Sequence, residues 1–314
     1  MPSKNEQTTA VIIMTYGSAN TAEHVKEYME HVYKDRVPAG LIEDFEERYR
    51  IVGGSPLVKI TKQQAELLSK VLNSNSDTVY IVRAAMLHSE PFIESVVDEC
   101  HKAGAKKIVG IILSPQFSSF IMEGYKSALQ NATIKSGYAP EDVIVAGPWP
   151  AEPKFVELLS RRVKAALEKL RQKHRVDVPV VFTTHSLPKR VVDKDPNYLD
   201  QLKITIDAVV KELDRPDMEW YQAYQSAGHT PEEWLKPDLM DILAKLRDKH
   251  DLAVLIVPIQ FLANHLEILY DLDIAGKQQC DDYGIKYNRI ELPNTDPLFI
   301  EALASITKNS LKSL

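Results

Sequence analysis

The sequence has only two cysteines among its 314 residues, Cys100 and Cys280, and neither lies in a C-x-x-C motif. They could form at most one disulfide, and we interpret them as buried or incidental thiols. No apolar run reaches the roughly 18 residues that a membrane helix needs, so we expect no membrane anchor. The polar N-terminal segment runs straight into a strand-like one, which predicts no secretory signal. We therefore expect a cytoplasmic, soluble protein.

Positive charge is slightly outnumbered, with 38 Lys and Arg against 44 Asp and Glu. The net charge is −6 and no basic cluster stands out, so a nucleic-acid partner is not expected. Nucleotide-binding loops are missing too. The segment after the first predicted strand, "TYGSAN", has one glycine instead of G-x-G-x-x-G, and no G-x-x-x-x-G-K-[ST] occurs. What remains is an ordinary globular composition, 44% hydrophobic and 26% charged, in a chain long enough for two domains or one large one.

Short apolar runs alternate with longer segments in which apolar residues recur at helical spacing. Eight runs are predicted strands: 10–16, 78–85, 107–113, 142–147, 178–184, 219–225, 252–259 and 287–292. Helical periodicity is clearest in 91–104, 154–173 and 238–250. Nearly continuous apolar strands that alternate with helices are typical of parallel sheets covered on both faces. The sequence therefore predicts an α/β fold.

The chain contains an internal repeat. A shift of 144 positions carries 108–123 onto 252–267 and, without a gap, 152–159 onto 296–303. The alternative is chance similarity between α/β segments. We interpret the match as a duplication, which predicts two similar lobes with one four-stranded parallel sheet each.

Polar side chains stand at or just past the predicted strand ends, where open parallel sheets bind ligands. They are Tyr16, His88, Gln116, His185, Gln225 and Gln260. If the two lobes face each other, both sets would line one cleft between them.

His185 is the first candidate for chemistry, because "TTHSLP" places it at the end of a buried strand. Partial desolvation disfavours the charged imidazolium, so a neutral imidazole would be available as a base. The alternative is a structural histidine that caps a turn. A nucleophilic Ser186 is less supported, because no G-x-S-x-G surrounds it.

An acidic stripe follows the seventh predicted strand. Glu267 and Asp271 are four residues apart and would share a helix face, which Asn264 extends. His265 lies about 200° of helical rotation from Glu267, so we expect it to point into the protein. A row of oxygen ligands suits transient handling of a metal or of protons better than a closed structural site. The alternative is a solvated helix face.

A third candidate region interrupts the first lobe at 45–66. Arg48, Tyr49 and Ser55, together with Tyr125 further along, are donors that could hold the carboxylates of an anionic ligand. Ordinary surface-loop chemistry is the alternative.

Taken together, these motifs resemble ferrochelatase over nearly the whole chain. The similar stretches are "MTYGS", "GGSPL", "HSEPF", "SPQFSSF", "EPKF", "THSLP", "DPNYLDQL", "YQSAGHTPEEWLKPD" and "HLEILYDLD". The length, the missing C-terminal extension and the lack of clustered cysteines resemble the Gram-positive branch, which inserts iron into coproporphyrin III rather than protoporphyrin IX.

The resemblance implies a monomer of two Rossmann-like lobes, residues 1–150 and 151–294, with the active site in the interdomain cleft. A C-terminal helix at about 295–314 would pack on the first lobe. It also implies Fe²⁺ as a substrate, no tightly bound cofactor and no iron–sulfur cluster. The partners would be coproporphyrin III and iron coproporphyrin.

The resemblance also implies residue roles. His185 is similar to the catalytic histidine that accepts a proton, and Glu267 to its partner carboxylate across the cleft. Tyr16 is similar to a tyrosine beside the macrocycle that ligates the product iron. Asp271 would continue the acidic path, so the implied metal contacts are His185, Glu267, Asp271 and Tyr16.

Propionate contacts would come from Arg48, Ser55 and Tyr125. Several positions depart from the family pattern. Asn264 replaces an aspartate of many relatives and Ala275 an outer acidic ligand, so we expect any outer metal site to be weak or absent. The loop holding Ser55 is one residue shorter than usual, which affects its role.

Three alternatives remain open from the sequence: a protoporphyrin IX ferrochelatase, a sirohydrochlorin-type chelatase and a non-catalytic tetrapyrrole-binding protein. Sirohydrochlorin-type chelatases usually carry several metal-binding histidines, whereas here His185 has no obvious second histidine on the acidic helix.

Overall fold

The computed structural model describes residues 8–34, 36–74, 76–174, 177–228 and 231–312. It divides into two compact units. The first contains Met1–Trp149 and Asn294–Leu314, and the second contains Pro150–Pro293. Each unit has its own parallel sheet and its own buried core.

The first unit is built on a four-stranded sheet in the order β2-β1-β3-β4, with every pair parallel. The strands are β1 (Thr8–Thr15), β2 (Val79–Met86), β3 (Lys107–Ile112) and β4 (Val143–Val145). The central strand β1 is buried over seven of its eight residues because helices cover both of its faces.

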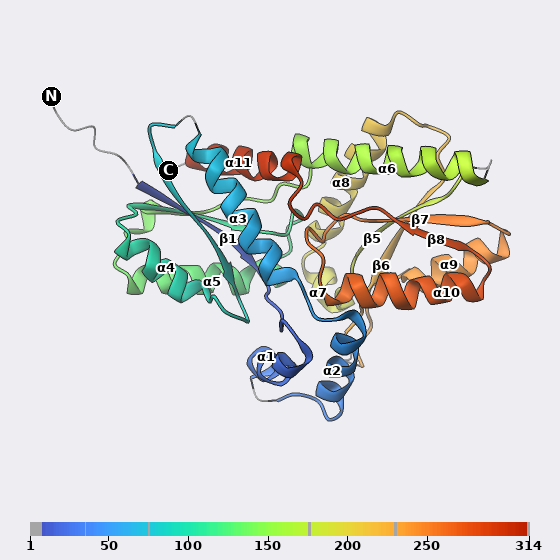
Figure 1. The fold of residues 1–314 in the computed structure, drawn as a ribbon, viewed down its shortest axis with the longest axis horizontal. Helices are drawn as coiled ribbons and strands as arrows, with labels where there is room; N and C mark the ends of the chain where they lie inside the picture. Colours follow the sequence, from blue (N-terminus) through green and yellow to red (C-terminus); the bar gives the residue numbers. More distant parts are fainter. Residues whose placement is uncertain (1–7, 35, 75, 175–176, 229–230, 313–314) are drawn as a thin grey trace. The chain divides into compact units, whose positions relative to one another are not determined.

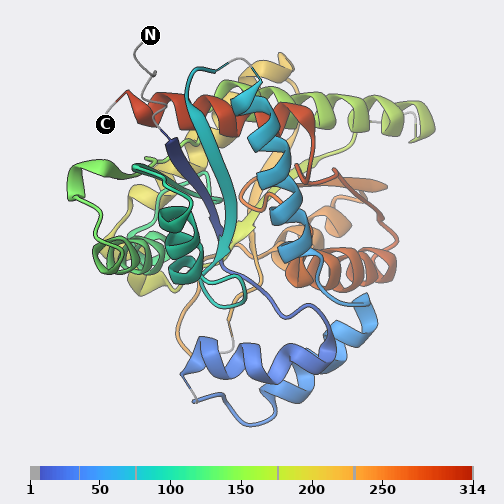
Figure 2. The same cartoon turned by 60° about the vertical axis from the view of Figure 1, so that its left-hand side comes forward.

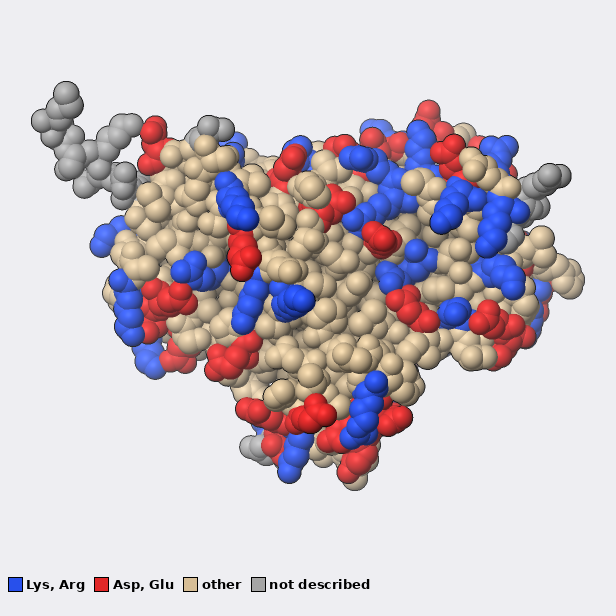
Figure 3. All heavy atoms as spheres, viewed as in Figure 1, with Lys and Arg blue, Asp and Glu red and all other residues tan. Residues whose placement is uncertain are grey.

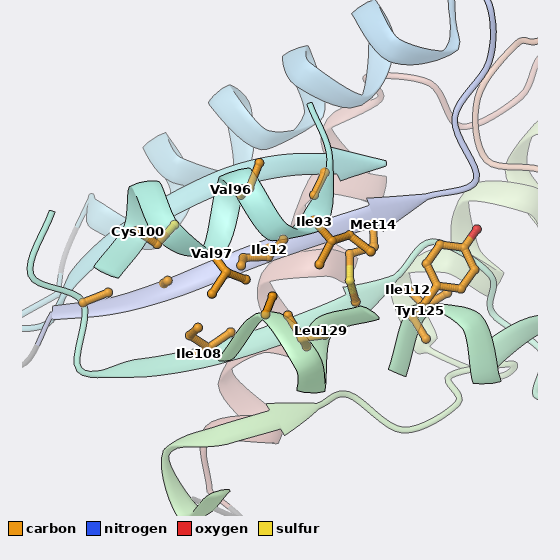
Figure 4. Close-up of a cluster of buried hydrophobic side chains, with 14 of the residues drawn as sticks. Ile12, Met14, Ile93, Val96, Val97, Cys100, Ile108, Ile112, Tyr125 and Leu129 are labelled. Carbon is orange, nitrogen blue, oxygen red and sulfur yellow. The ribbon is translucent and has the colours of Figure 1, made fainter. Parts of the chain in front are cut away.

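Helices α4 (Ile93–Lys102) and α5 (Ser119–Lys135) cover one face of this sheet. Alternate residues of β1, such as Ile12 and Met14, join their apolar side chains in one cluster, which Figure 4 shows in close-up. Helices α3 (Leu57–Asn73) and α11 (Pro297–Leu311) lie side by side (Figures 1 and 2). Helix α3 contacts β1 and β2, and α11 contacts β3 and β4.

The chain between β1 and α3 forms two further helices, α1 (Val25–Tyr33) and α2 (Leu41–Val52). These two helices pack on each other. Both views place them beyond the end of β1, so they extend from the sheet instead of covering it (Figures 1 and 2). Two 3₁₀ turns complete the unit, η1 (Ala22–His24) and η2 (Pro140–Asp142).

The second unit repeats this plan with a sheet in the order β6-β5-β7-β8, again all parallel. Its strands are β5 (Val180–His185), β6 (Trp220–Gln225), β7 (Ala253–Pro258) and β8 (Lys286–Arg289). Its helices are α6 (Pro153–His174), α7 (Lys189–Lys194), α8 (Asn197–Leu213), α9 (Leu239–Asp248), the π-helix η3 (Ile268–Gly276) and α10 (Lys277–Asp282).

The two sheets have the same topology, since replacing each strand of the first by the strand four later gives the second order. The shift of 144 positions also carries the first residue of α6, Pro153, onto the first residue of α11, Pro297. Helix α6 belongs to the second unit and α11 to the first, so each repeat ends in a helix that is assigned to the other unit.

The predicted fold class is confirmed. All eight predicted strands are present, and most observed bounds lie within two or three residues of the predicted ones. Cys100 and Cys280 are both free and buried, as expected. Among the described residues, no helix is long and apolar enough to cross a membrane. On the face shown in Figure 3, basic and acidic side chains are interspersed.

Candidate functional site

His185 is the last residue of β5, and its surroundings determine which ring nitrogen is free. The Nδ1 atom contacts the carbonyl oxygen of Ser186. A carbonyl can only accept, so this contact places a hydrogen on Nδ1. In the neutral ring Nε2 then carries the lone pair and can accept a proton. The side chain is 28% exposed.

Glu267 faces that nitrogen. It is the helical residue immediately before η3, and its Oε2 is 3.6 Å from Nε2 of His185. The Nε2 atom of His265 lies 3.7 Å from the same oxygen. One carboxylate oxygen therefore stands between two imidazoles.

The charge on Glu267 is stabilised by these neighbours. Burial alone raises the pKa of its carboxyl, but the His185 and His265 rings together hold that pKa below its usual value. Glu267 is therefore ionised at neutral pH. The ionised carboxylate lies 3.6 Å from Nε2 of His185.

His185 and Glu267 both belong to the second unit. They meet because β5 and β7 are neighbours in one sheet, which places their following residues at the same edge. His265 was expected to point into the protein. Its side chain is 14% exposed, and its Nε2 also approaches the Glu267 carboxylate.

The acidic stripe is not the regular α-helix that was predicted. Ile268–Gly276 is a π-helix, and Asn264 precedes the helical residues instead of extending their face. Such i→i+5 segments are rare and are frequent at functional sites. Asp271 accepts a hydrogen bond from Ser226, which follows β6, so it is held at the same edge of the sheet.

No group of three or more His, Cys, Asp and Glu side chains among the described residues forms a candidate metal site. Of the four predicted metal contacts, His185, Glu267 and Asp271 lie in the second unit and Tyr16 in the first. The structure brings His185 and Glu267 into contact.

Asp273, on the same segment, forms an ion pair with an arginine. Both of its oxygens contact the Arg289 guanidinium on β8, at 2.7 and 2.6 Å, and Tyr287 donates to it at 3.2 Å. The Arg289 side chain is only 13% exposed, so the pair is largely removed from water. The Asp273–Arg289 pair connects the π-helix to the edge strand β8.

We expect Asp273→Ala to destabilise the protein by about 2–3 kcal/mol, because the change leaves a largely buried guanidinium without its carboxylate. Iron insertion should stay within about twofold of wild type, measured beside urea unfolding midpoints. Asp207→Ala removes an exposed pair with Lys203 and should cost less than about 1 kcal/mol. A collapse of activity at unchanged stability would instead place Asp273 in the reaction path.

In the first unit, Tyr16 follows β1 and is 45% exposed. Its ring lies 4.4 Å from that of His88, centroid to centroid. His88 in turn contacts His31, with 3.1 Å between the two Nδ1 atoms. Burial, helped by the nearby charges of His31 and Lys34, lowers the pKa of His88 to about 4. His88 is therefore neutral at physiological pH and packs against Tyr16 as an uncharged ring.

Gly17 makes this placement of Tyr16 possible. Its φ of +92° lies in the region that favours glycine, and a Cβ there would lie 2.5 Å from Ser89 Oγ. Gly54 has the same role before Ser55, since its φ is +98° and a Cβ would lie 2.4 Å from the Asn20 carbonyl oxygen.

The three predicted propionate contacts also lie in the first unit, in different settings. Arg48 pairs with Asp44 one turn earlier on α2, at 2.9 Å. Ser55 is buried, and its Oγ accepts from the N–H of Leu57 at 3.5 Å. Tyr125 is buried at the edge of the apolar cluster beside Ile112, as Figure 4 shows. Burial and the nearby Tyr16 raise the pKa of Tyr125, so it remains a neutral donor.

Comparison with known proteins decides the family. The family model described as ferrochelatase matches residues 8–311. The chain belongs to the ferrochelatase family. As a ferrochelatase, it is a metal-chelating enzyme that inserts iron into a porphyrin.

Named relatives match this ferrochelatase over almost their whole length. The coproporphyrin III ferrochelatase of Geobacillus thermodenitrificans is 36% identical over 98% of this chain and 97% of its own. That of Anoxybacillus flavithermus is 35% identical, over 98% of each chain. A protein named ferrochelatase from Herpetosiphon aurantiacus is 36% identical over 95% of this chain and 97% of its own.

Solved structures show the same fold at low identity. SirB from Bacillus subtilis with Fe³⁺ matches 96% of this ferrochelatase and 95% of its own chain, with a TM-score of 0.57 and 13% identity. CbiX, described as the terminal enzyme of sirohaem biosynthesis in denitrifying bacteria, covers 96% and 99% with a TM-score of 0.53 and 10% identity. These likenesses support the chelatase-type fold.

Sequence reasoning about this ferrochelatase named His265 and Gln260 but missed two of their contacts. These are the approach of His265 to Glu267 and the hydrogen bond from the His185 N–H to Gln260. Asn264 followed by Glu267 has the N-x-x-E spacing of a helix start. A helix start at this point means that the direction of the His265 side chain cannot be inferred from a regular helical wheel. The carbonyl of His265 accepts from the N–H groups of Ile268 and Leu269, which places this residue at the helix start.

Proposed function

We propose that this ferrochelatase inserts Fe²⁺ into coproporphyrin III and that His185 accepts a pyrrole proton beside Glu267. The observation that carries the chemical part is the 3.6 Å approach of His185 Nε2 to an ionised Glu267. The substrate part is supported by relatives about 35% identical that bear the name coproporphyrin III ferrochelatase.

The reaction exchanges protons for a metal. Two pyrrole N–H bonds break, Fe²⁺ forms bonds to the four ring nitrogens and two protons leave. Because Nδ1 is held by the Ser186 carbonyl, Nε2 of His185 is the base that takes one of them. Proton transfer to that nitrogen creates an imidazolium next to Glu267, whose negative charge stabilises it.

The acids act as carriers. The lowered pKa of Glu267 means that it holds a proton only briefly, so it passes protons on and offers an oxygen to the incoming Fe²⁺. Asp271, held by Ser226, continues this path one helical turn later. Iron is the substrate here, and no tightly bound cofactor or iron–sulfur cluster takes part.

The first unit supplies porphyrin contacts in this proposal. Tyr16 lies by the macrocycle and contacts the iron of the product. Arg48, Ser55 and Tyr125 bind propionates through a guanidinium and two hydroxyl groups. Coproporphyrin III carries four propionates and protoporphyrin IX two, so such donors favour the former. We further propose a cytoplasmic monomer with coproporphyrin III and iron coproporphyrin as its ligands. The position of the active site between the lobes stays a prediction.

Anaerobic absorption spectroscopy tests this proposal. Purified protein is mixed with coproporphyrin III and then with Fe²⁺. We expect the Soret band to shift and the four Q bands of the free base to collapse at a rate proportional to enzyme. Porphyrin binding without that spectral change would contradict the proposal and would indicate a tetrapyrrole carrier.

A further inference from the structure

We propose that Tyr198 and Gln260 form a hydrogen-bonded clamp that positions His185, and this inference rests on the proposed function. Three contacts close a ring. The N–H of His185 donates to Oε1 of Gln260 at 3.0 Å, Nε2 of Gln260 donates to the Tyr198 hydroxyl at 3.1 Å, and that hydroxyl donates to the carbonyl of His185 at 3.2 Å.

The clamp continues the sheet where its backbone ladder stops. Strands β5 and β7 pair up to Thr183 and Pro258, and the last backbone bond runs from Ile259 to the Thr183 carbonyl. Beyond that point the N–H of His185 donates to the side chain of Gln260, which follows β7. The catalytic histidine thus remains anchored on that side although it is the last residue of its strand.

The chemistry of the three groups fixes their roles. A backbone N–H can only donate, so Gln260 must present its oxygen to His185 and its NH₂ to Tyr198. Burial raises the pKa of Tyr198, so its hydroxyl keeps the proton that it donates to the His185 carbonyl. Tyr198 is 1% exposed and Gln260 5% exposed, so water does not compete for these bonds.

Anchoring both backbone groups of His185 fixes the direction of its Cα–Cβ bond. The imidazole then keeps Nδ1 on the Ser186 carbonyl and Nε2 toward Glu267. Because catalytic groups need placement within about 0.5 Å, loosening this peptide lowers turnover without removing a reacting group. Tyr198 and Gln260 are therefore positioning residues.

The test compares Tyr198→Phe, Gln260→Met and the double variant with wild type. We expect kcat for iron insertion to fall about 10–100-fold in each single variant, while KM for coproporphyrin III changes less than about twofold. Both changes open the same ring, so the double variant should fall little further than the worse single one. Long-range ¹H–¹⁵N spectra should show the Nδ1–H tautomer of His185 in wild type and a tautomer mixture in the variants.

Thr205→Val is the matched control. Thr205 is buried on α8, like Tyr198, and its hydroxyl donates to the Pro150 carbonyl at 2.8 Å. This variant should lose comparable stability but keep kcat and the His185 tautomer. If Tyr198→Phe and Gln260→Met behave like Thr205→Val in an active enzyme, the clamp is wrong and the proposed function stands. A wild-type protein that inserts no iron overturns the proposed function and the clamp with it.

Discussion

Replacing His185 by alanine is expected to lower kcat for iron insertion by about 10²–10⁴-fold, the range that general acid–base catalysis contributes. The change removes the Nε2 lone pair that, in the proposed mechanism, takes the pyrrole proton. Porphyrin binding, measured by fluorescence quenching, should stay within about threefold of wild type, because the side chain contributes a proton acceptor more than a binding surface.

His101→Ala is the control for a general effect of histidine removal. His101 lies on α4 in the first unit, where its ring contacts Tyr138. That variant should retain wild-type turnover. Turnover within about threefold of wild type in His185→Ala, with the porphyrin bound, would refute the role assigned to His185.

Glu267→Gln should lower kcat by about 10²–10³-fold, comparable to the loss of one preorganised electrostatic contact. The amide keeps the size of the side chain but removes the negative charge 3.6 Å from Nε2 of His185, which in the proposed mechanism stabilises the accepted proton. In the same mechanism the amide would offer Fe²⁺ a poorer oxygen ligand. Steady-state rates at saturating porphyrin and varied Fe²⁺ separate the two contributions, since weaker metal handling raises KM for Fe²⁺.

The internal repeat supplies a matched control for this change. Glu123 occupies the position equivalent to Glu267 in the first repeat. It is exposed, and its Oε1 accepts from Ser127. Glu123→Gln should therefore leave both kcat and KM unchanged. Equal losses in the two variants would mean that a carboxylate at this helical position has a structural role in either lobe.

The fold was predictable because its causes are local and repetitive. Apolar strands such as 252–259 alternate with amphipathic helices, and the 144-residue repeat doubles the evidence. The place of the C-terminal helix was expected only from the resemblance to ferrochelatase. Nothing in the sequence of α6 or α11 states which sheet the helix covers, and the assignment of α11 to the first unit depends on its packing against α3.

The candidate site was predictable as a list of residues but not as a geometry. His185 and Glu267 stand out because the first ends a buried strand and the second comes after another. Their contact depends on which strands are neighbours, and a spacing of 82 positions does not encode this. The approach of His265 depends on a helix start and a π-helix that a regular helical wheel does not represent.

The most direct measurement is the ratio of kcat/KM for coproporphyrin III to that for protoporphyrin IX, determined anaerobically with Fe²⁺ on the wild-type protein. We expect coproporphyrin III to be favoured by at least about tenfold, which corresponds to about 1.4 kcal/mol of additional transition-state binding. A ratio of one or below, with protoporphyrin IX metallated as fast or faster, would contradict the account.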